Sequence, residues 1–180
     1  TEWAGEDLTK AVLIDRGLYH EPVTPTSYAW MAHDGRNLYV GIRNEVDPGK
    51  PLVTGARWAG NDAVEVALRY PSGAETAPIL VLRGYPDGTF ESSAEARAPD
   101  KVVKAAGELV TFAAKVVNAA HWTAEYRIPL KLLTTDVPPG MTIECNLSVR
   151  KIAGPHWVMW QGTGGLTWET GKAGILELAE

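Results

Sequence analysis

The residues that could do chemistry are concentrated in one stretch, 56–70, which combines a tryptophan with a nearby carboxylate. It begins as a polar loop that carries Trp58 and continues as an alternating strand from Asp62. Strand side chains point to opposite faces in turn, so Glu65 lies between two alanines on one face. A flat aromatic ring, a carboxylate and small neighbours are what a polyhydroxylated ligand needs. The simpler alternative is a half-buried strand with Trp58 packed on its own loop and Glu65 in water.

A second tryptophan, Trp168, also lies outside any alternating apolar face. It belongs to the glycine-rich loop 162–174 and, like Trp58, comes just before a strand. Exposed indoles suit sugar binding, because the C–H faces of a sugar ring pack on them while its hydroxyls reach polar groups. Packing against its own loop is the simpler explanation for each tryptophan alone. The two together favour a ligand site.

The composition excludes several classes of function. A net charge of −5 without a Lys/Arg cluster argues against nucleic-acid binding, and no apolar run is long enough to span a membrane. The single cysteine, Cys145, rules out an internal disulfide. It shares a strand face with Ile143 and Leu147, so we expect a buried, inert thiol. The chain starts at Thr1 without Met or a signal peptide, and we expect a mature protein or a domain of a longer one.

The elements that must position these residues are predicted to be short strands. The clearest hairpin pairs 27–33 with 38–46 across the turn Asp34-Gly35-Arg36-Asn37. The prolines at 22 and 25 predict a loop over 17–26, and 108–117 is predicted to be a strand. Pro129 allows one helical turn at 130–133. We therefore predict an all-β fold, an antiparallel β-sandwich of about ten short strands with one short helical turn.

The predicted strand 141–152 has one apolar and one polar face. Ile143, Cys145, Leu147 and Val149 share the first face. The second face carries four polar residues in a row, and it is either a solvated outer face or the floor of a polar groove. These polar residues are Glu144, Asn146, Ser148 and Arg150.

No catalytic residues are predicted. The chain has no Gly-x-Ser-x-Gly motif, and its four histidines lack the spacing of metal ligands. A glycosidase would need two carboxylates flanking the scissile bond. Asp62 and Glu65 match the last two acids of the sandwich pattern Glu-x-Asp-x-x-Glu, but its first position is Gly60. We therefore expect a protein that is not an enzyme.

Five segments in order resemble the family 9 carbohydrate-binding modules and their relatives in the DOMON-like superfamily. The resemblance covers nearly the whole chain, so residues 1–180 are expected to form a single domain of this kind. The matching segments are Asp34-Gly35-Arg36-Asn37-Leu38-Tyr39-Val40-Gly41-Ile42, Trp58…Asn61-Asp62-Ala63-Val64-Glu65-Val66, Trp122-Thr123-Ala124-Glu125-Tyr126-Arg127-Ile128-Pro129, Gly140…Ile143…Asn146…Arg150 and Gly174-Ile175-Leu176-Glu177-Leu178.

The resemblance implies capture of a sugar ring, such as a chain end, between two tryptophans. By motif these would be Trp58 and Trp168, with Glu65 accepting hydrogen bonds from sugar hydroxyls and Arg83 as its basic partner. The spacing from Trp58 to Glu65 is one residue longer than the family pattern, through Gly60. On this basis, Trp168→Ala is expected to abolish sugar binding without lowering stability.

The resemblance also implies a structural calcium ion, for which Asp47 and Asp62 are candidates by position. It predicts a mono- or oligosaccharide ligand, a secreted (extracellular or periplasmic) location, and attachment to other domains such as that of a carbohydrate-active enzyme. We expect a monomer with no nucleic-acid or membrane partner. Two alternatives are a ligandless structural module and a noncovalent haem-binding domain, whose axial ligands would come from Met31, Met159, His33 and His156.

Overall fold

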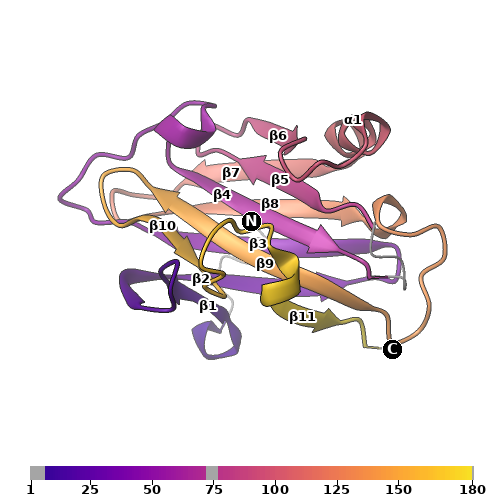
Figure 1. Cartoon of the computed structure of the whole chain (residues 1–180). Helices are drawn as coiled ribbons and strands as arrows, with labels where there is room; N and C mark the ends of the chain where they lie inside the picture. Colours follow the sequence, from indigo (N-terminus) through magenta and orange to yellow (C-terminus); the bar gives the residue numbers. More distant parts are fainter. Residues whose placement is uncertain (1–6, 72–76, 180) are drawn as a thin grey trace.

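A computed structural model describes residues 7–71 and 77–179 and confirms the predicted all-β class (Figure 1). All strand pairs in this part of the chain are antiparallel. None of its helices is long and apolar enough to cross a membrane. The strands are β1 (Val12–Arg16), β2 (Pro22–His33), β3 (Asn37–Glu45), β4 (Ala63–Arg69), β5 (Leu80–Gly84), β6 (Phe90–Ser93), β7 (Thr111–Val116), β8 (His121–Pro129), β9 (Thr142–Lys151), β10 (His156–Met159) and β11 (Gly174–Glu177).

The strands form two layers that face each other across the core. The hydrogen-bonded order is β6-β5-β4-β9-β10-β1-β2-β3-β8-β7, with β11 also paired to β9. Strands β10 and β1 are joined at a single pair, Arg16 with Met159, and there the sheet passes from one layer to the other. In Figure 1, β4, β5 and β9 lie in front of β3, β8 and β7. The Tyr126 hydroxyl on β8 donates a hydrogen bond to the Val64 carbonyl on β4, which links the layers (3.4 Å).

The core contains the apolar faces that strand alternation predicts. Ile143, Cys145, Leu147 and Val149 on β9 are fully buried, as the sequence pattern predicted. They pack in one cluster with the apolar faces of β4, β3 and β8. Burial raises the pKa of the Cys145 thiol to about 12. The predicted buried thiol is therefore confirmed.

Strand β2 begins earlier than the sequence indicated. Residues 17–26 were expected to be a loop because of Pro22 and Pro25, yet β2 starts at Pro22. The register of β2 against β1 shifts between Ile14 and Arg16, and β2 pairs with β3 only from Tyr28 onwards. The prolines therefore lie at the strand start and in an irregular segment, where a missing N–H costs no ladder hydrogen bond.

A helix, α1 (Asp100–Leu109), was not predicted from the sequence. The strand expected at 108–117 is the shorter β7, which follows this helix. Pro99 precedes the helix and Asp100 lies in its first turn, both of which favour a helix start. Helix α1 packs against β6, β5 and the 3₁₀ turn Leu130–Leu132 with Ala106 buried. The apolar residues of α1 therefore pack against the edge of the sandwich. The other 3₁₀ turns are Leu8–Lys10, Trp58–Gly60 and Thr170–Lys172.

Candidate functional site

The register of four neighbouring strands places polar side chains in one row on the face of the sheet that points away from the core. Glu65 on β4 pairs with Arg83 on β5 and with Ser148 on β9. Arg83 in turn pairs with Glu91 on β6. Directly opposed residues on antiparallel strands project on the same face, so this row is fixed by strand pairing rather than by closeness in sequence.

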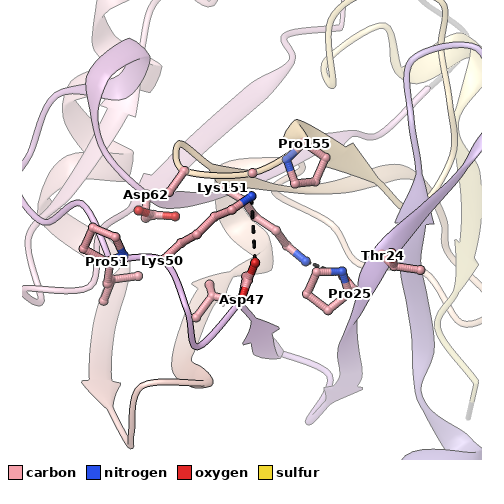
Figure 2. Close-up of a pocket in the computed structure, with 12 residues that line it drawn as sticks. Thr24, Pro25, Asp47, Lys50, Pro51, Asp62, Lys151 and Pro155 are labelled. Carbon is pink, nitrogen blue, oxygen red and sulfur yellow. Dashed lines mark hydrogen bonds and ion pairs between the residues drawn. The ribbon is translucent and has the colours of Figure 1, made fainter.

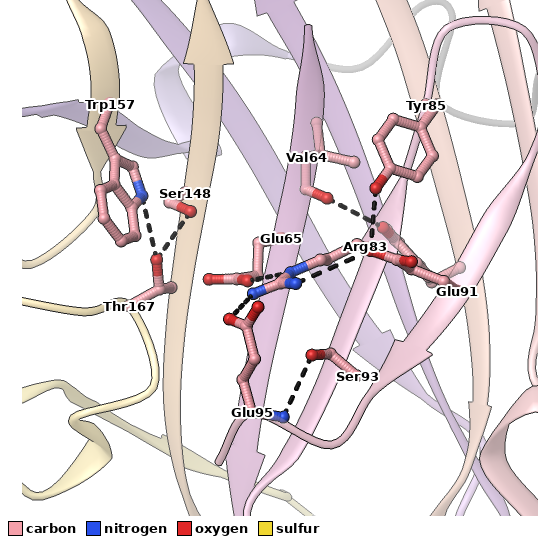
Figure 3. A network of polar contacts seen from close by, with 11 residues as sticks. Val64, Glu65, Arg83, Tyr85, Glu91, Ser93, Glu95, Ser148, Trp157 and Thr167 are labelled. Carbon is pink, nitrogen blue, oxygen red and sulfur yellow. Dashed lines mark hydrogen bonds and ion pairs between the residues drawn. The ribbon is translucent and has the colours of Figure 1, made fainter. Parts of the chain in front are cut away.

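Arg83 is the centre of an ion-pair network (Figure 3). Its Nε donates to Glu65 Oε2 (2.7 Å), and its Nη2 donates to Glu95 Oε2 (2.6 Å). Its Nη1 lies 3.7 Å from Glu91 Oε1, which also accepts a hydrogen bond from the Tyr85 hydroxyl (2.8 Å). Arg83 is 3% exposed and Glu65 is completely buried. The arginine is therefore committed to three carboxylates and holds them in place.

Two tryptophans lie above this row. The Arg83 guanidinium carbon is 4.2 Å from the centre of the Trp58 ring, within the range of a cation–π contact. Trp157 on β10 lies edge-on to Trp58, with ring centres 6.3 Å apart and planes at 86°. The Arg150 guanidinium carbon is 4.8 Å from the centre of the Trp58 ring and 4.9 Å from that of Trp157. Both indoles are partly exposed, so each retains surface for a ligand.

The orientation of Trp157 is fixed by the glycine-rich loop. Trp157 Nε1 donates to the Thr167 hydroxyl (3.1 Å), which donates to Ser148 Oγ (2.8 Å). Asn146 Nδ2 donates to the carbonyls of Gln161 and Thr167 (3.0 and 3.3 Å). Asn146 and Ser148 are completely buried. Of the two alternatives for the polar face of β9, the structure thus shows a covered floor beneath the loop and Trp157.

Two polar groups at this site lack hydrogen-bond partners among the described residues. They are Glu65 Oε1 and Arg150 Nε, an acceptor and a donor. Arg150 also makes no ion pair there, and burial lowers its pKa. Burial raises the pKa of Glu65, and Arg83 and the nearby Thr167 hydroxyl oppose that shift. The Thr167 hydroxyl donates to Ser148, so Glu65 Oε1 has no hydrogen-bond donor among the described residues, but it is completely buried and a ligand reaches it only if the covering side chains move.

The structure brings together three of the four predicted ligand-binding residues. Trp58 contacts Arg83, and Arg83 binds Glu65. Trp168 instead lines an open depression of about 300 Å³ with Arg69 and Ile79. Arg69 is four residues beyond Glu65 on β4, about 13 Å along the strand. Among the described residues, the aromatic ring next to Trp58 is therefore that of Trp157, and the ligand role expected for Trp168 stays a prediction.

Three residues of the site, Trp157, Arg150 and Thr167, have no predicted ligand role from the sequence. Trp157 was placed in a short strand, and Arg150 was one of the four polar residues of its own strand. The pairing of β10 with β9 places Trp157 directly opposite Arg150, and β4 places Ala63 on the other side of Arg150. Alternation predicts the face of each residue, but only the strand order brings these faces together.

The calcium candidates do not belong to this row of polar side chains. Asp47 and Asp62 line a small cavity together with Lys50 and Lys151, so two lysines share the space with the two acids. Within the described residues, no group of three or more His, Cys, Asp or Glu side chains is arranged to hold a metal ion. Of the methionines considered for haem, Met159 is fully buried and Met31 packs against the core. Both therefore serve as core residues.

Solved structures that resemble this chain include two complexes of a carbohydrate-binding module. A family 9 module from Caldicellulosiruptor kristjanssonii, solved in complex with cellotriose, has a TM-score of 0.69 at 14% identity and covers 96% of this chain and 84% of its own. Its complex with glucose gives a TM-score of 0.69 at 16% identity, with 97% and 88% covered. A Bacteroides uniformis protein thought to bind carbohydrate gives 0.66 at 14% identity, with 94% and 86% covered.

Comparisons at the sequence level are less extensive. No protein-family model matches the chain. A Psychrobacter cryohalolentis protein whose name suggests a 3-methyladenine DNA glycosylase is 41% identical over 63 residues. The match covers 35% of this chain, and the chain spans about a quarter (26%) of that protein. The structural likeness therefore establishes the fold, and the partial sequence match establishes no activity.

Proposed function

We propose that this chain, which has the fold of the family 9 carbohydrate-binding modules, binds a sugar without catalysis at the face formed by β5, β4, β9 and β10. The observation that carries the proposal is the pair of unpartnered groups, Glu65 Oε1 and Arg150 Nε, beside two partly exposed indoles. A buried acceptor and a buried donor without partners cost free energy, which a ligand that satisfies both would recover.

A sugar supplies the complementary groups. When Trp58 turns aside and uncovers these buried atoms, one hydroxyl donates to Glu65 Oε1, and a second hydroxyl or the ring oxygen accepts from Arg150. The C–H face of the ring packs on an indole, where apolar surface is buried and a polar edge remains available. The solved relatives in complex with cellotriose and glucose are consistent with a sugar of this kind.

We assign the aromatic contacts to Trp58 and Trp157. The two rings are nearly perpendicular, so a sugar stacks on one of them unless Trp58 turns away from Arg83. Trp58 belongs to a short 3₁₀ turn in the loop before β4, whereas Trp157 is held by β10 and by Thr167. Trp157 is therefore the fixed platform, and Trp58 is the ring that adjusts to the ligand.

The arrangement of carboxylates supports a binding role over hydrolysis. A glycosidase needs one carboxyl group that donates a proton and a second that acts from the other side of the bond. Glu65 and Glu95 both bind the same arginine, and Arg83 lowers the pKa of Glu95. A carboxylate held ionised by an arginine is a poor proton donor. We propose that the module serves a carbohydrate-active enzyme outside the cytoplasm as an accessory domain.

Isothermal titration with glucose, xylose, galactose, cellobiose and xylobiose tests the proposal. Trp157→Ala should weaken binding by about 30-fold or more, because an aromatic anchor at the centre of a site contributes about 2 kcal/mol or more. Trp168→Ala is the matched control, since it removes an indole that lies in the loop after β10 and lines a separate depression with Arg69, and it should leave affinity within about threefold.

Two results would count against the proposal. Absence of heat with every sugar, in a protein with its native fluorescence and melting transition, would exclude binding of the tested sugars. Loss of binding in Trp168→Ala with full binding in Trp157→Ala would restore the clamp that the sequence resemblance implied. A reduced disaccharide in the same series then shows whether the module recognises a reducing chain end.

A further inference from the structure

A small cavity of about 80 Å³ is lined by none of the residues of the proposed sugar site, although one of its residues, Lys151, directly follows Arg150 (Figure 2). Its walls come from the first part of β2, the loop after β3, the residue before β4 and the end of β9. The polar groups at this place are the Pro25 carbonyl, two acids, Asp47 and Asp62, and two lysines, Lys50 and Lys151. The site therefore combines oxygen ligands with built-in positive charges.

Lys151 is the buried member of this set. It follows Val149 on the core face of β9 and is only 3% exposed. Its ammonium group donates a hydrogen bond to the carbonyl of Pro25 on β2, which belongs to the opposite layer. The side chain thus joins the two layers through a charged group at the end of the core.

Two acids, Glu45 and Asp62, act on the charge of Lys151 from beyond ion-pair distance. Asp62 is 2% exposed, and its carboxylate accepts a hydrogen bond from the Val53 N–H (2.7 Å). Burial lowers the pKa of Lys151 to about 8, while Glu45 and Asp62 act in the opposite direction. An amine with this pKa is still mostly protonated at pH 7. The ammonium group is therefore a cation under ordinary conditions.

This donor set does not fit calcium. Calcium takes six to eight oxygen ligands, and its favoured sites gather several carboxylates without a competing cation. Here the Pro25 carbonyl already binds an ammonium group, and Lys50 lies 3.8 Å from Asp47. A divalent ion would face two lysines in a cavity with room for about two or three waters.

We propose that the Lys151 ammonium group is a built-in structural cation, which fills the place of a metal ion and makes the stability of this fold independent of calcium. One side chain then performs two tasks of a bound ion. It neutralises Asp62 inside the protein, and it connects the β2 carbonyl to β9. Because the cation is covalently part of the chain, removal of free metal cannot release it.

Thermal unfolding of the wild-type chain with millimolar calcium and with excess chelator is the first measurement. The midpoint should be the same in both. Lys151→Met keeps most of the aliphatic stem but removes the charge, and we expect its midpoint to fall by about 4–12 °C, because the Pro25 carbonyl and Asp62 lose their cation. Lys151→Arg, which keeps a cation, should lose less than Lys151→Met.

Lys50→Met is the matched control, because Lys50 lies in the same cavity but its side chain is 49% exposed. Its midpoint should fall by about 4 °C or less, as for an exposed ion pair. A rise in the wild-type midpoint with calcium would overturn the proposal, and so would a Lys151→Met midpoint equal to wild type. If Lys151→Met does not fold, the calcium titration of the wild type and the Lys151→Arg variant still decide. Sugar binding plays no part in this readout.

Discussion

Replacement of Arg83 by methionine tests whether the network under Trp58 depends on one guanidinium. Arg83 and Glu65 form the most buried ion pair in the described part of the chain, with side chains 4% and 0% exposed. Removing one partner of such a pair leaves an uncompensated buried charge, which costs about 3–5 kcal/mol. Arg83→Met should therefore lower the free energy of unfolding by that amount at neutral pH.

The pH dependence of this loss identifies its cause. Without Arg83, the largest influence that opposes burial is lost, so the folded-state pKa of Glu65 rises further above the unfolded value of about 4.3. The unfolded state then releases its proton at a lower pH than the folded state does, and stability falls as pH rises through this window. The loss in Arg83→Met should be full above the raised pKa and should shrink as pH falls towards the unfolded value.

Equilibrium unfolding in urea, followed by tryptophan fluorescence at acidic and at neutral pH, measures this loss. Glu95→Gln is the matched control. It removes another carboxylate from the same arginine, but the Glu95 side chain is 57% exposed, so we expect a loss of about 1 kcal/mol or less. The double variant Glu65→Gln/Arg83→Met should recover part of the stability. A loss in Arg83→Met that is under about 1 kcal/mol, or that is equal at both pH values, would refute the reasoning.

Two further predictions concern packing. Cys145 should not react with a thiol reagent in the native protein, since it is fully buried with its pKa raised to about 12, and stoichiometric labelling without denaturant would contradict this. Gly84→Ala should destabilise the protein by about 1–3 kcal/mol in urea unfolding, because the new Cβ would lie 2.2 Å from the Phe112 ring. Gly107→Ala, in the interior of α1 with nothing within 4 Å, should instead stabilise by about 0.5–1 kcal/mol, and equal effects of the two substitutions would count against the packing argument.

The sequence by itself determined most of the strands and the apolar faces that they turn to the core. Period-two alternation fixed the core faces of β3, β4 and β9, because a shift of one residue would expose every apolar side chain. Turn chemistry at 34–37 fixed the hairpin of β2 and β3. The same alternation placed Cys145 in the core. These features depend on neighbours along the chain, so they can be predicted from short windows of sequence.

The sequence pattern was less informative where a segment is compatible with more than one type of secondary structure. Helix α1 is only ten residues long and is followed directly by a strand. Its apolar residues therefore fit the spacing of a helix and the spacing of a strand about equally well. The prolines in β2 are compatible with a strand only because that segment lacks a partner on one side. In both cases the neighbouring elements decide, and a single stretch of sequence does not contain them.

Only the tertiary structure decided the composition of the two polar sites. Trp157 and Arg150 become neighbours because β10 pairs with β9, and Trp58 joins them because β4 lies on the other side of β9. Lys151 reaches Pro25 because the two layers close over the same end of the core. Alternation along a strand predicts to which face of the sheet a side chain points. The residues that it then contacts depend on the order of the strands and on the packing of the two layers. Both of these arise from contacts between residues far apart in sequence.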